Sequence, residues 1–310
     1  MLTILFSARP DRWAEYEAPL TRALSAAGIG PFRVVTDAAP EEVDYIVYAP
    51  NGGLSDFSVF PNLKAVLSLW AGVEKIVGNP TLRVPLTRMV DTGLREGMRE
   101  WVTGHVLRHH LGMDAQIKGA PGVWAPQVPL LARDRTVAIL GLGTLGTACA
   151  ETLLALGFRV TGWSRSPKSL PGVTCFHGAE GLRDCLSEAE IVVLLLPDTP
   201  ATENTLNAET LALLPRGAFV INPGRGPLID DAALLAALDS GQVAHATLDV
   251  FRVEPLPADH PFWAHPGVTV TPHIASETRP ATACDVVAEN IRRQEAGEPL
   301  LYLVDRAAGY

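Results

Sequence analysis

The sequence predicts an α/β protein with two domains, each built around a parallel β-sheet. Three observations support this prediction. The chain has 310 residues, and a domain usually contains about 100–200. Short apolar runs typical of buried strands alternate with helical patterns along almost the whole chain. One of these runs ends in a glycine-rich turn that leads directly into a helical pattern.

The first part of the chain predicts four buried strands and two helices. A helix is expected over residues 12–27, and Gly28 is placed to end it. A longer helix is expected over residues 95–116, because apolar side chains recur there at i, i+3 and i+4 spacing. Residues 119–129 contain three prolines and two glycines, which predicts an irregular arm. The expected strands are residues 2–6, 32–35, 45–48 and 65–69.

A second alternating series begins at Thr136 and predicts six more strands. One of its helices has clear end signals, since Asp230 can cap its start and Gly241 can end it. A last helix over residues 279–296 brings the chain close to its end. The expected strands are residues 137–140, 160–163, 191–195, 219–222, 246–248 and 268–271.

The composition argues against several classes of function. The net charge is −9 with a pI of about 5.4, and no run of Lys and Arg could form the basic face that nucleic acid requires. The four cysteines show no CxxC spacing, which argues against a zinc site and is typical of a reducing compartment. No signal peptide is evident, and no apolar run approaches the ~18 residues of a membrane span. We therefore expect a cytoplasmic protein that acts without nucleic acid or membrane.

Residues 136–146 read TVAILGLGTLG and place a GxGxxG pattern between a strand and a helix. In this context the pattern is typical of a dinucleotide-binding Rossmann domain, although a purely structural turn is the alternative. Gly141 permits the tight turn, Gly143 lets the backbone approach a pyrophosphate, and Gly146 lets helix and strand pack closely. The expected cofactor contacts in this turn are Gly141, Gly143, Thr144, Leu145 and Gly146.

The loop after the next strand indicates which dinucleotide is bound. In NAD-binding domains an acidic residue about 20 positions after the glycines usually binds the ribose hydroxyl. Residues 162–168 read GWSRSPK and contain no carboxylate, but Arg165 could give a planar, charge-assisted contact to a 2′-phosphate. We therefore expect NADPH to be preferred and NADH to be possible, and the alternative is an ordinary solvated loop. The expected contacts are Ser164, Arg165, Ser166 and Lys168.

Four segments of the second half read GLGTLG, INPGRGPLIDDAALLAAL, LDVFRVEPLP and VTVTPHIAS, and an earlier one reads LSLWAGVEKI. In sequence and in order they resemble the signatures of the D-isomer-specific 2-hydroxyacid dehydrogenases over most of residues 136–276. The pieces DTG near Asp91, WSRSPKSLPGV and VDRAAGY resemble the glyoxylate/hydroxypyruvate reductase subgroup. The resemblance implies a reductase of small 2-ketoacids that converts glyoxylate to glycolate and hydroxypyruvate to D-glycerate.

The resemblance assigns Arg225, Glu254 and His273 as the catalytic residues, and the chemistry of ketoacid reduction agrees. The fork of Arg225 can hold the substrate carboxylate and reach the carbonyl oxygen. Hydride delivery turns that oxygen into an alkoxide, and His273 is suited to supply the proton. Glu254 would hydrogen-bond the other ring nitrogen and favour the protonated ring. Taken singly, the alternatives are an exposed arginine, a solvated turn glutamate and a loop histidine.

The resemblance also implies contacts for the substrate and for the rest of the cofactor. Backbone N–H groups of residues 70–73 would hold the substrate carboxylate. Trp70 replaces the small residue common in the wider family. An indole that points inward would leave room for short substrates only, and the alternative is that it stacks on protein and leaves the cleft open to larger groups. Asp249 matches an aspartate near the nicotinamide carboxamide, and a structural role at a strand end is the alternative. The expected substrate contacts are Trp70, Ala71, Gly72 and Arg225, and the further cofactor contacts are Pro197, Thr202 and Asp249.

By the resemblance, residues 97–275 form the dinucleotide-binding domain, and residues 1–96 with 276–310 form a discontinuous, flavodoxin-like substrate domain. The substrate would bind in the cleft between them, and domain closure would exclude water before hydride transfer. A homodimer is implied, with residues 119–129 reaching over the partner.

Several other functions share parts of this pattern. One is a dehydrogenase for larger ketoacids such as phenylpyruvate, and another is a dinucleotide-sensing binding protein of the same fold. A β-hydroxyacid dehydrogenase is disfavoured, because neither its catalytic lysine nor the length for its helical C-terminal domain is present. No metal site is expected at His105 and His109, because no HExxH pattern accompanies their i, i+4 spacing.

Overall fold

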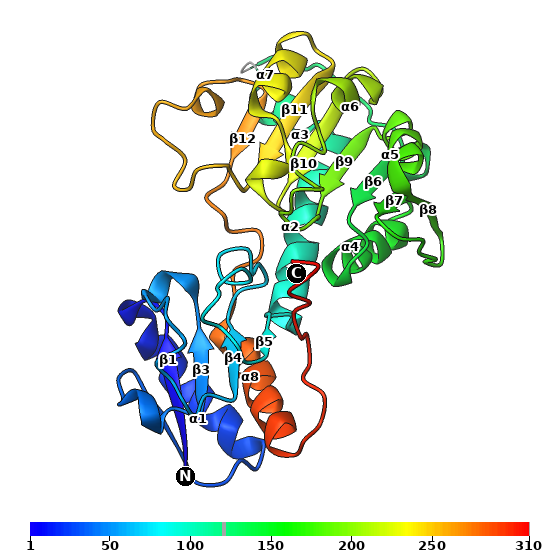
Figure 1. The fold of residues 1–310 in the computed structure, drawn as a ribbon. Helices are drawn as coiled ribbons and strands as arrows, with labels where there is room; N and C mark the ends of the chain where they lie inside the picture. Colours follow the sequence, from blue (N-terminus) through cyan, green and yellow to red (C-terminus); the bar gives the residue numbers. More distant parts are fainter. Residues whose placement is uncertain (120–121, 310) are drawn as a thin grey trace. The chain divides into compact units, whose positions relative to one another are not determined.

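The protein folds into two compact α/β units, seen in a computed structural model that describes residues 1–119 and 122–309 (Figure 1). The first unit combines Met1–Leu94 with Thr278–Tyr310, and the second unit is Arg95–Glu277. Each unit contains one sheet whose strands all pair in parallel. The predicted fold class, two parallel-sheet α/β domains of which one is discontinuous, is therefore confirmed.

The first unit has a five-stranded sheet in the order β2-β1-β3-β4-β5. Strand residues point alternately to its two faces, so Ile4 packs with Leu20 and Ile291 of two helices, while Leu5 belongs to the core of the other face. One of these helices, α8, comes from the end of the chain, which is why this unit is discontinuous. The strands are β1 (Leu2–Ser7), β2 (Phe32–Val35), β3 (Tyr45–Tyr48), β4 (Ala65–Ser68) and β5 (Leu86–Thr87), and the helices are α1 (Trp13–Ala26) and α8 (Pro280–Glu295).

The second unit has a seven-stranded sheet in the order β12-β11-β10-β9-β6-β7-β8. The chain starts at β6, builds outward to β8, and then returns to add β9 on the other side. This is the strand order of a Rossmann domain, and ligands bind where such an order reverses. The strands are β6 (Thr136–Leu140), β7 (Arg159–Ser164), β8 (Val173–His177), β9 (Ile191–Leu194), β10 (Ala218–Asn222), β11 (Val243–Leu248) and β12 (Val268–Val270).

Helices cover both faces of this second sheet. Val106 and Leu153 pack on one face, and Leu186 and Leu234 pack on the other. The cap predicted for α7 is confirmed, because the Asp230 side chain accepts a hydrogen bond from the Ala233 N–H at 3.0 Å. The helices are α2 (Thr92–His110), α3 (Met113–Ile117), α4 (Thr144–Ala155), α5 (Gly178–Ser187), α6 (Ala208–Leu213) and α7 (Asp231–Asp239).

The single helix expected over residues 95–116 is wrong. The structure has two helices there, α2 and α3, because Gly112 adopts a left-handed conformation with φ of 64°. The described residues of the arm, Gly119 and residues 122–129, form neither helix nor strand, as predicted, and Ala120 and Pro121 lie outside the described residues. Within the described chain, no helix is both long and apolar enough to cross a membrane.

Candidate active site

The glycine turn lies at the centre of the second sheet, between β6 and α4. Gly141 has a φ of 111°, and a Cβ atom there would lie 2.5 Å from the carbonyl oxygen of Leu195. A Cβ atom on Gly146 would lie 1.9 Å from the carbonyl oxygen of Gly141, so both positions require glycine. At Gly143 the same direction is open space. The turn thus leaves room for a ligand beside the free N–H groups at the start of α4, which fits a dinucleotide pyrophosphate.

The loop after β7 begins at the same edge of the sheet as the glycine turn. Trp163, near the end of β7, pairs with Leu140, the last residue of β6. The Ser164 hydroxyl donates to the carbonyl of Ser166 at 2.8 Å, which shapes the loop. Arg165 and Lys168 are exposed. The edge nearest the glycine turn therefore carries two cations and no carboxylate within residues 162–168.

The turn after β9 is built by Thr202. Its hydroxyl donates to the carbonyl of Pro197 at 2.7 Å and also accepts the N–H of Thr199 at 3.0 Å. The side chain of Thr202 is therefore used to form the turn, and the segment it shapes follows β9, the strand beside β6. Its sequence-based assignment as a cofactor contact stays a prediction.

The catalytic group predicted from the sequence comes together at the carboxyl ends of β10, β11 and β12. Nδ1 of His273 lies 2.7 Å from Oε2 of Glu254, and Oε1 of Glu254 accepts the N–H of Phe251 at 2.9 Å. The side chains of His273 and Glu254 are 52% and 35% exposed, so the ring is accessible. Because Nδ1 faces the carboxylate, Nε2 is the ring nitrogen left for a substrate.

The electrostatics of Glu254 place Arg225 in the same group. Burial opposes ionisation of the carboxyl group, but the hydrogen bonds from His273 and from the Phe251 N–H outweigh it. The positive charges of His273 and Arg225 act in the same direction, and together they hold the pKa of Glu254 below its usual value. The carboxylate therefore stays charged at neutral pH.

Two features fix the Arg225 loop beside the Glu254 loop. A Cβ atom on Gly226 would lie 2.0 Å from the carbonyl carbon of Phe251, so only glycine lets the two backbones approach this closely. On the far side, the Arg252 guanidinium donates to the carbonyl of Ile229 at 2.7 Å. Neither Gly226 nor Arg252 is predicted to matter from the sequence, because the contacts join segments that are far apart in the chain.

Asn222 is a further residue that the sequence analysis missed. It ends β10 and is buried, with only 1% of its surface exposed. Its side chain donates to the carbonyl of Arg225 at 2.8 Å and accepts the N–H of Gly224 at 3.1 Å. The one available signal was a polar residue at the end of an apolar strand, directly before a Pro-Gly turn.

Residues 70–73 belong to the first unit and follow β4. The Trp70 carbonyl accepts the N–H of Met89 at 3.0 Å, and the Trp70 N–H donates to the Ser68 hydroxyl at 3.1 Å. The N–H groups of Ala71 and Gly72 have no acceptor among the described residues. The loop thus offers backbone donors, as a carboxylate-binding loop must.

The histidines of α2 are part of the core. His109 is buried, stacks on Phe219 and contacts the Thr247 hydroxyl through Nε2 at 2.9 Å. Burial, together with the nearby His245 and Arg108, lowers the pKa of His109 to about 3. Within the described residues, no group of three or more His, Cys, Asp or Glu side chains is placed to hold a metal ion.

Comparison with known proteins identifies the family of this chain. Residues 103–275 match the family model for the NAD binding domain of D-isomer specific 2-hydroxyacid dehydrogenases. Glyoxylate/hydroxypyruvate reductase A of Yersinia enterocolitica and that of Serratia proteamaculans are each 44% identical over 256 residues, which covers 80% of this chain and 82% of theirs.

Two solved structures are similar along the whole chain. A D-isomer specific 2-hydroxyacid dehydrogenase from Xanthobacter autotrophicus Py2, in complex with NADPH and MES, has a TM-score of 0.90 at 45% identity, covering 99% of both chains. An NADPH-dependent glyoxylate/hydroxypyruvate reductase from Sinorhizobium meliloti, in complex with NADP and sulfate, has a TM-score of 0.85 at 36% identity, covering 100% of both.

The second unit combines a dinucleotide-binding sheet with a histidine, a glutamate and an arginine at the carboxyl ends of its strands. This combination is typical of one class of protein, the nicotinamide-dependent oxidoreductases. The comparisons specify that class further. The chain belongs to the D-isomer specific 2-hydroxyacid dehydrogenase family, and within it the chain groups with the glyoxylate/hydroxypyruvate reductases.

Proposed function

We propose that the protein is an NADPH-preferring reductase of small 2-ketoacids, which converts glyoxylate to glycolate and hydroxypyruvate to D-glycerate. The observation that carries the proposal is the His273–Glu254 pair beside Arg225, on the same sheet edge as the glycine turn. The names of the relatives and the NADPH and NADP bound in two similar structures support it.

In the proposed reaction each catalytic residue handles one part of the substrate. When bound, the reduced nicotinamide supplies a hydride to the carbonyl carbon. Nε2 of His273 donates a proton to the carbonyl oxygen as that oxygen becomes an alkoxide, so the ketone gains one hydride and one proton. Glu254 holds the ring through Nδ1 and stabilises the imidazolium. Arg225 orients the ketoacid by its carboxylate. In the first unit, the N–H groups of Ala71 and Gly72, which have no acceptor among the described residues, are the proposed backbone donors to a carboxylate.

We assign the preference for NADPH to the loop after β7. Arg165 and Lys168 can attract a 2′-phosphate, and the exposed Ser166 hydroxyl can donate to it, whereas the Ser164 hydroxyl already donates to the Ser166 carbonyl and shapes the loop. A carboxylate in this loop would bind the ribose hydroxyl of NADH and repel the phosphate, and residues 162–168 contain none. NADH stays a possible, poorer cofactor.

The experiment that tests this function is an assay of the purified protein with a panel of ketoacids. We expect NADPH absorbance to fall with glyoxylate and hydroxypyruvate, and faster than NADH absorbance does. Phenylpyruvate should be poorer, because the Trp70 indole would occupy the space that a long side chain needs. Trp70→Ala should reduce the difference in kcat/KM between hydroxypyruvate and phenylpyruvate. Faster reduction of phenylpyruvate by the wild type would favour a dehydrogenase for larger ketoacids, and no reduction of any ketoacid would favour a dinucleotide-sensing protein.

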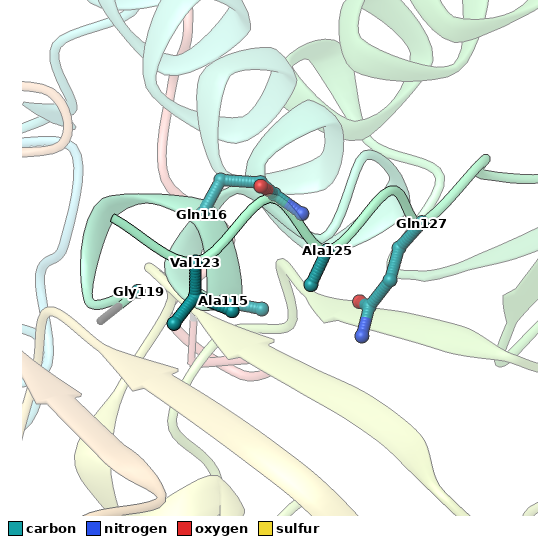
Figure 2. Close-up of a pocket in the computed structure, with 6 residues that line it drawn as sticks. All are labelled: Ala115, Gln116, Gly119, Val123, Ala125 and Gln127. Carbon is teal, nitrogen blue, oxygen red and sulfur yellow. The ribbon is translucent and has the colours of Figure 1, made fainter. Parts of the chain in front are cut away.

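We also propose that the protein is a homodimer and acts in the cytoplasm. Apolar side chains are exposed along residues 111–117 and 123–131, with Trp124 at 94% and Val128 at 93%. Figure 2 shows the hollow between α3 and this arm, lined by Gln116, Val123 and Gln127 among others. Such apolar exposure is unusual for a monomer and suits a second copy of the chain. Light scattering should give twice the monomer mass, and Trp124→Glu should reduce it; a monomeric wild type would contradict this proposal.

A further inference from the structure

The segment that carries His273 is wrapped around the side chain of Asp249. Oδ1 of Asp249 accepts the Thr271 hydroxyl at 2.5 Å and the Ile274 N–H at 3.0 Å, and Oδ2 accepts the Ala275 N–H at 2.8 Å. The Asp249 carbonyl accepts the N–H of His273 itself at 2.9 Å. Four hydrogen bonds that residues 271–275 donate to Asp249 therefore fix this segment.

Asp249 is buried, and its carboxylate is used by contacts within the protein. It follows β11 directly and has no exposed surface. A carboxylate can accept about four hydrogen bonds, and three of these positions are taken by donors from the His273 segment. The sequence resemblance placed this residue near the nicotinamide carboxamide, but its contacts within the second unit point mainly toward the His273 segment.

The backbone of His273 needs this support. Its φ is 56°, in the left-handed region that residues other than glycine rarely adopt. Such a conformation persists only where the surrounding structure holds it in place. If the segment relaxed, the ring would turn away from Glu254, and the Nδ1 contact at 2.7 Å would be lost.

We propose that Asp249 is a positioning residue for the proton donor: it holds residues 271–275 so that the His273 ring stays bound to Glu254 with Nε2 directed to the substrate. This inference rests on the proposed function for its catalytic meaning. It adds a role for a residue that does not itself touch the reacting atoms. The competing role is a direct contact with the cofactor.

Two variants separate the positioning of His273 from a general loss of stability. Asp249→Asn removes one acceptor oxygen and also a buried charge that His105 of α2 senses. Thr271→Val removes only the hydroxyl donor and leaves every charge in place. Thr269→Val is the matched control, because it removes a hydroxyl two residues away, in β12, that bonds His245 and Arg108 instead of Asp249.

The first readout is the tautomer of His273, measured by ring nitrogen NMR on ligand-free protein labelled in histidine and assigned with His273→Gln. In wild type the neutral ring should carry its proton on Nδ1, because that nitrogen donates to Glu254. Thr271→Val and Asp249→Asn should shift the ring toward the Nε2–H tautomer, and Thr269→Val should not. This readout needs no turnover, so it stays informative even if the protein reduces no ketoacid and the proposed function fails.

The second readout separates kcat from cofactor binding. In Asp249→Asn and Thr271→Val, kcat for hydroxypyruvate should fall by about tenfold to a hundredfold, while the Kd for NADPH stays close to that of wild type. An unchanged tautomer with a much weaker Kd for NADPH would assign Asp249 to the cofactor and overturn the proposal. A tautomer shift in Thr269→Val as large as that in Thr271→Val would also overturn the proposed role of Asp249. If Asp249→Asn does not fold, Thr271→Val decides alone.

Discussion

At the scale of single residues, the site depends on the different chemistry of one cation, one acid and one imidazole. Arg225 is the only one of the three whose proposed role requires a fork of donors. Its loop is held from behind by the buried Asn222, so the guanidinium starts from a defined position. Replacing Arg225 therefore tests geometry as well as charge.

Arg225→Ala should lower kcat/KM for glyoxylate by about 10²–10³-fold, because the substrate loses a charged anchor at the oxygen where negative charge develops. Arg225→Lys should restore only part of that loss, since a point charge cannot replace a bidentate fork. NADPH affinity should change little in both. Steady-state kinetics and fluorescence titration measure these quantities, with the exposed Arg216→Ala as control. A large loss of NADPH affinity would instead place Arg225 at the cofactor.

The charge of Glu254 predicts a change in the pH profile. Its pKa lies below the usual value, so the carboxylate is present throughout the neutral range and can stabilise the imidazolium of His273. In Glu254→Gln this stabilisation is lost, and the alkaline limb of the kcat/KM profile for reduction should move to lower pH by about one unit or more. The profile is measured between pH 5 and pH 9 in both proteins. The same limb at the same pH in both would contradict the pairing.

At the scale of elements, the strand ends decide what each segment can do. All strands of the second sheet run in parallel, so the loops after β6, β7, β10 and β12 meet at one edge. This arrangement places the glycine turn, the two cations after β7 and the catalytic group on a common side of the sheet. A change in one loop can therefore alter one function and leave the others intact.

The loop after β7 predicts a selective effect on the cofactor. Arg165→Ala should lower kcat/KM for NADPH by about tenfold to a hundredfold, since a charge-assisted bond to phosphate is lost, and it should change kcat/KM for NADH far less. The exposed Arg183→Ala, in the same domain, is the control. Equal losses for both cofactors would refute the assignment of the 2′-phosphate to Arg165.

The elements also show what can be predicted from sequence and why. Buried parallel strands and the glycine turn can be predicted because they have local sequence patterns. All ten expected strands are present in the structure, and their ends differ from the predicted ones by a few residues at most. The edge strand β8 was missed because its side chains are half-exposed, which removes the apolar run. The break at Gly112 was missed because the apolar spacing continues across it.

The contacts that hold the site are not visible in a local pattern. Asn222 and Gly226 lie within or beside the motif that identified Arg225, but their partners and packing depend on how the loops meet at the sheet edge. The three hydrogen bonds from residues 271–275 to the carboxylate of Asp249 likewise join segments more than 20 residues apart. Sequence motifs therefore predict the candidate catalytic side chains, and the structure adds the contacts that hold their loops.

At the scale of the whole molecule, buried histidines predict how stability depends on pH. Burial lowers the pKa of His109 to about 3 and that of His245 to about 4, against about 6.5 in an unfolded chain. Below pH 6.5 the unfolded chain therefore binds more protons than the folded one, and stability falls as the pH falls toward 4. The free energy of unfolding in urea should drop between pH 7 and pH 5.

A variant isolates the contribution of His109. His109→Gln should flatten this dependence, by up to about 1.4 kcal/mol per pH unit, because one buried titrating group is removed. His177→Gln should not flatten it, because His177 is exposed. An equally steep dependence in His109→Gln would show that other groups govern acid unfolding.

The proposed role of His273 as proton donor is tested by the turnover of hydroxypyruvate with NADPH in His273→Ala and in wild type, with NADPH binding measured in both. We expect kcat to fall by about 10²–10⁴-fold in His273→Ala, because the proton donor is gone, while the Kd for NADPH is nearly unchanged. Turnover at the wild-type rate in His273→Ala would contradict the assignment of His273 as the proton donor, and with it the mechanism proposed for this protein.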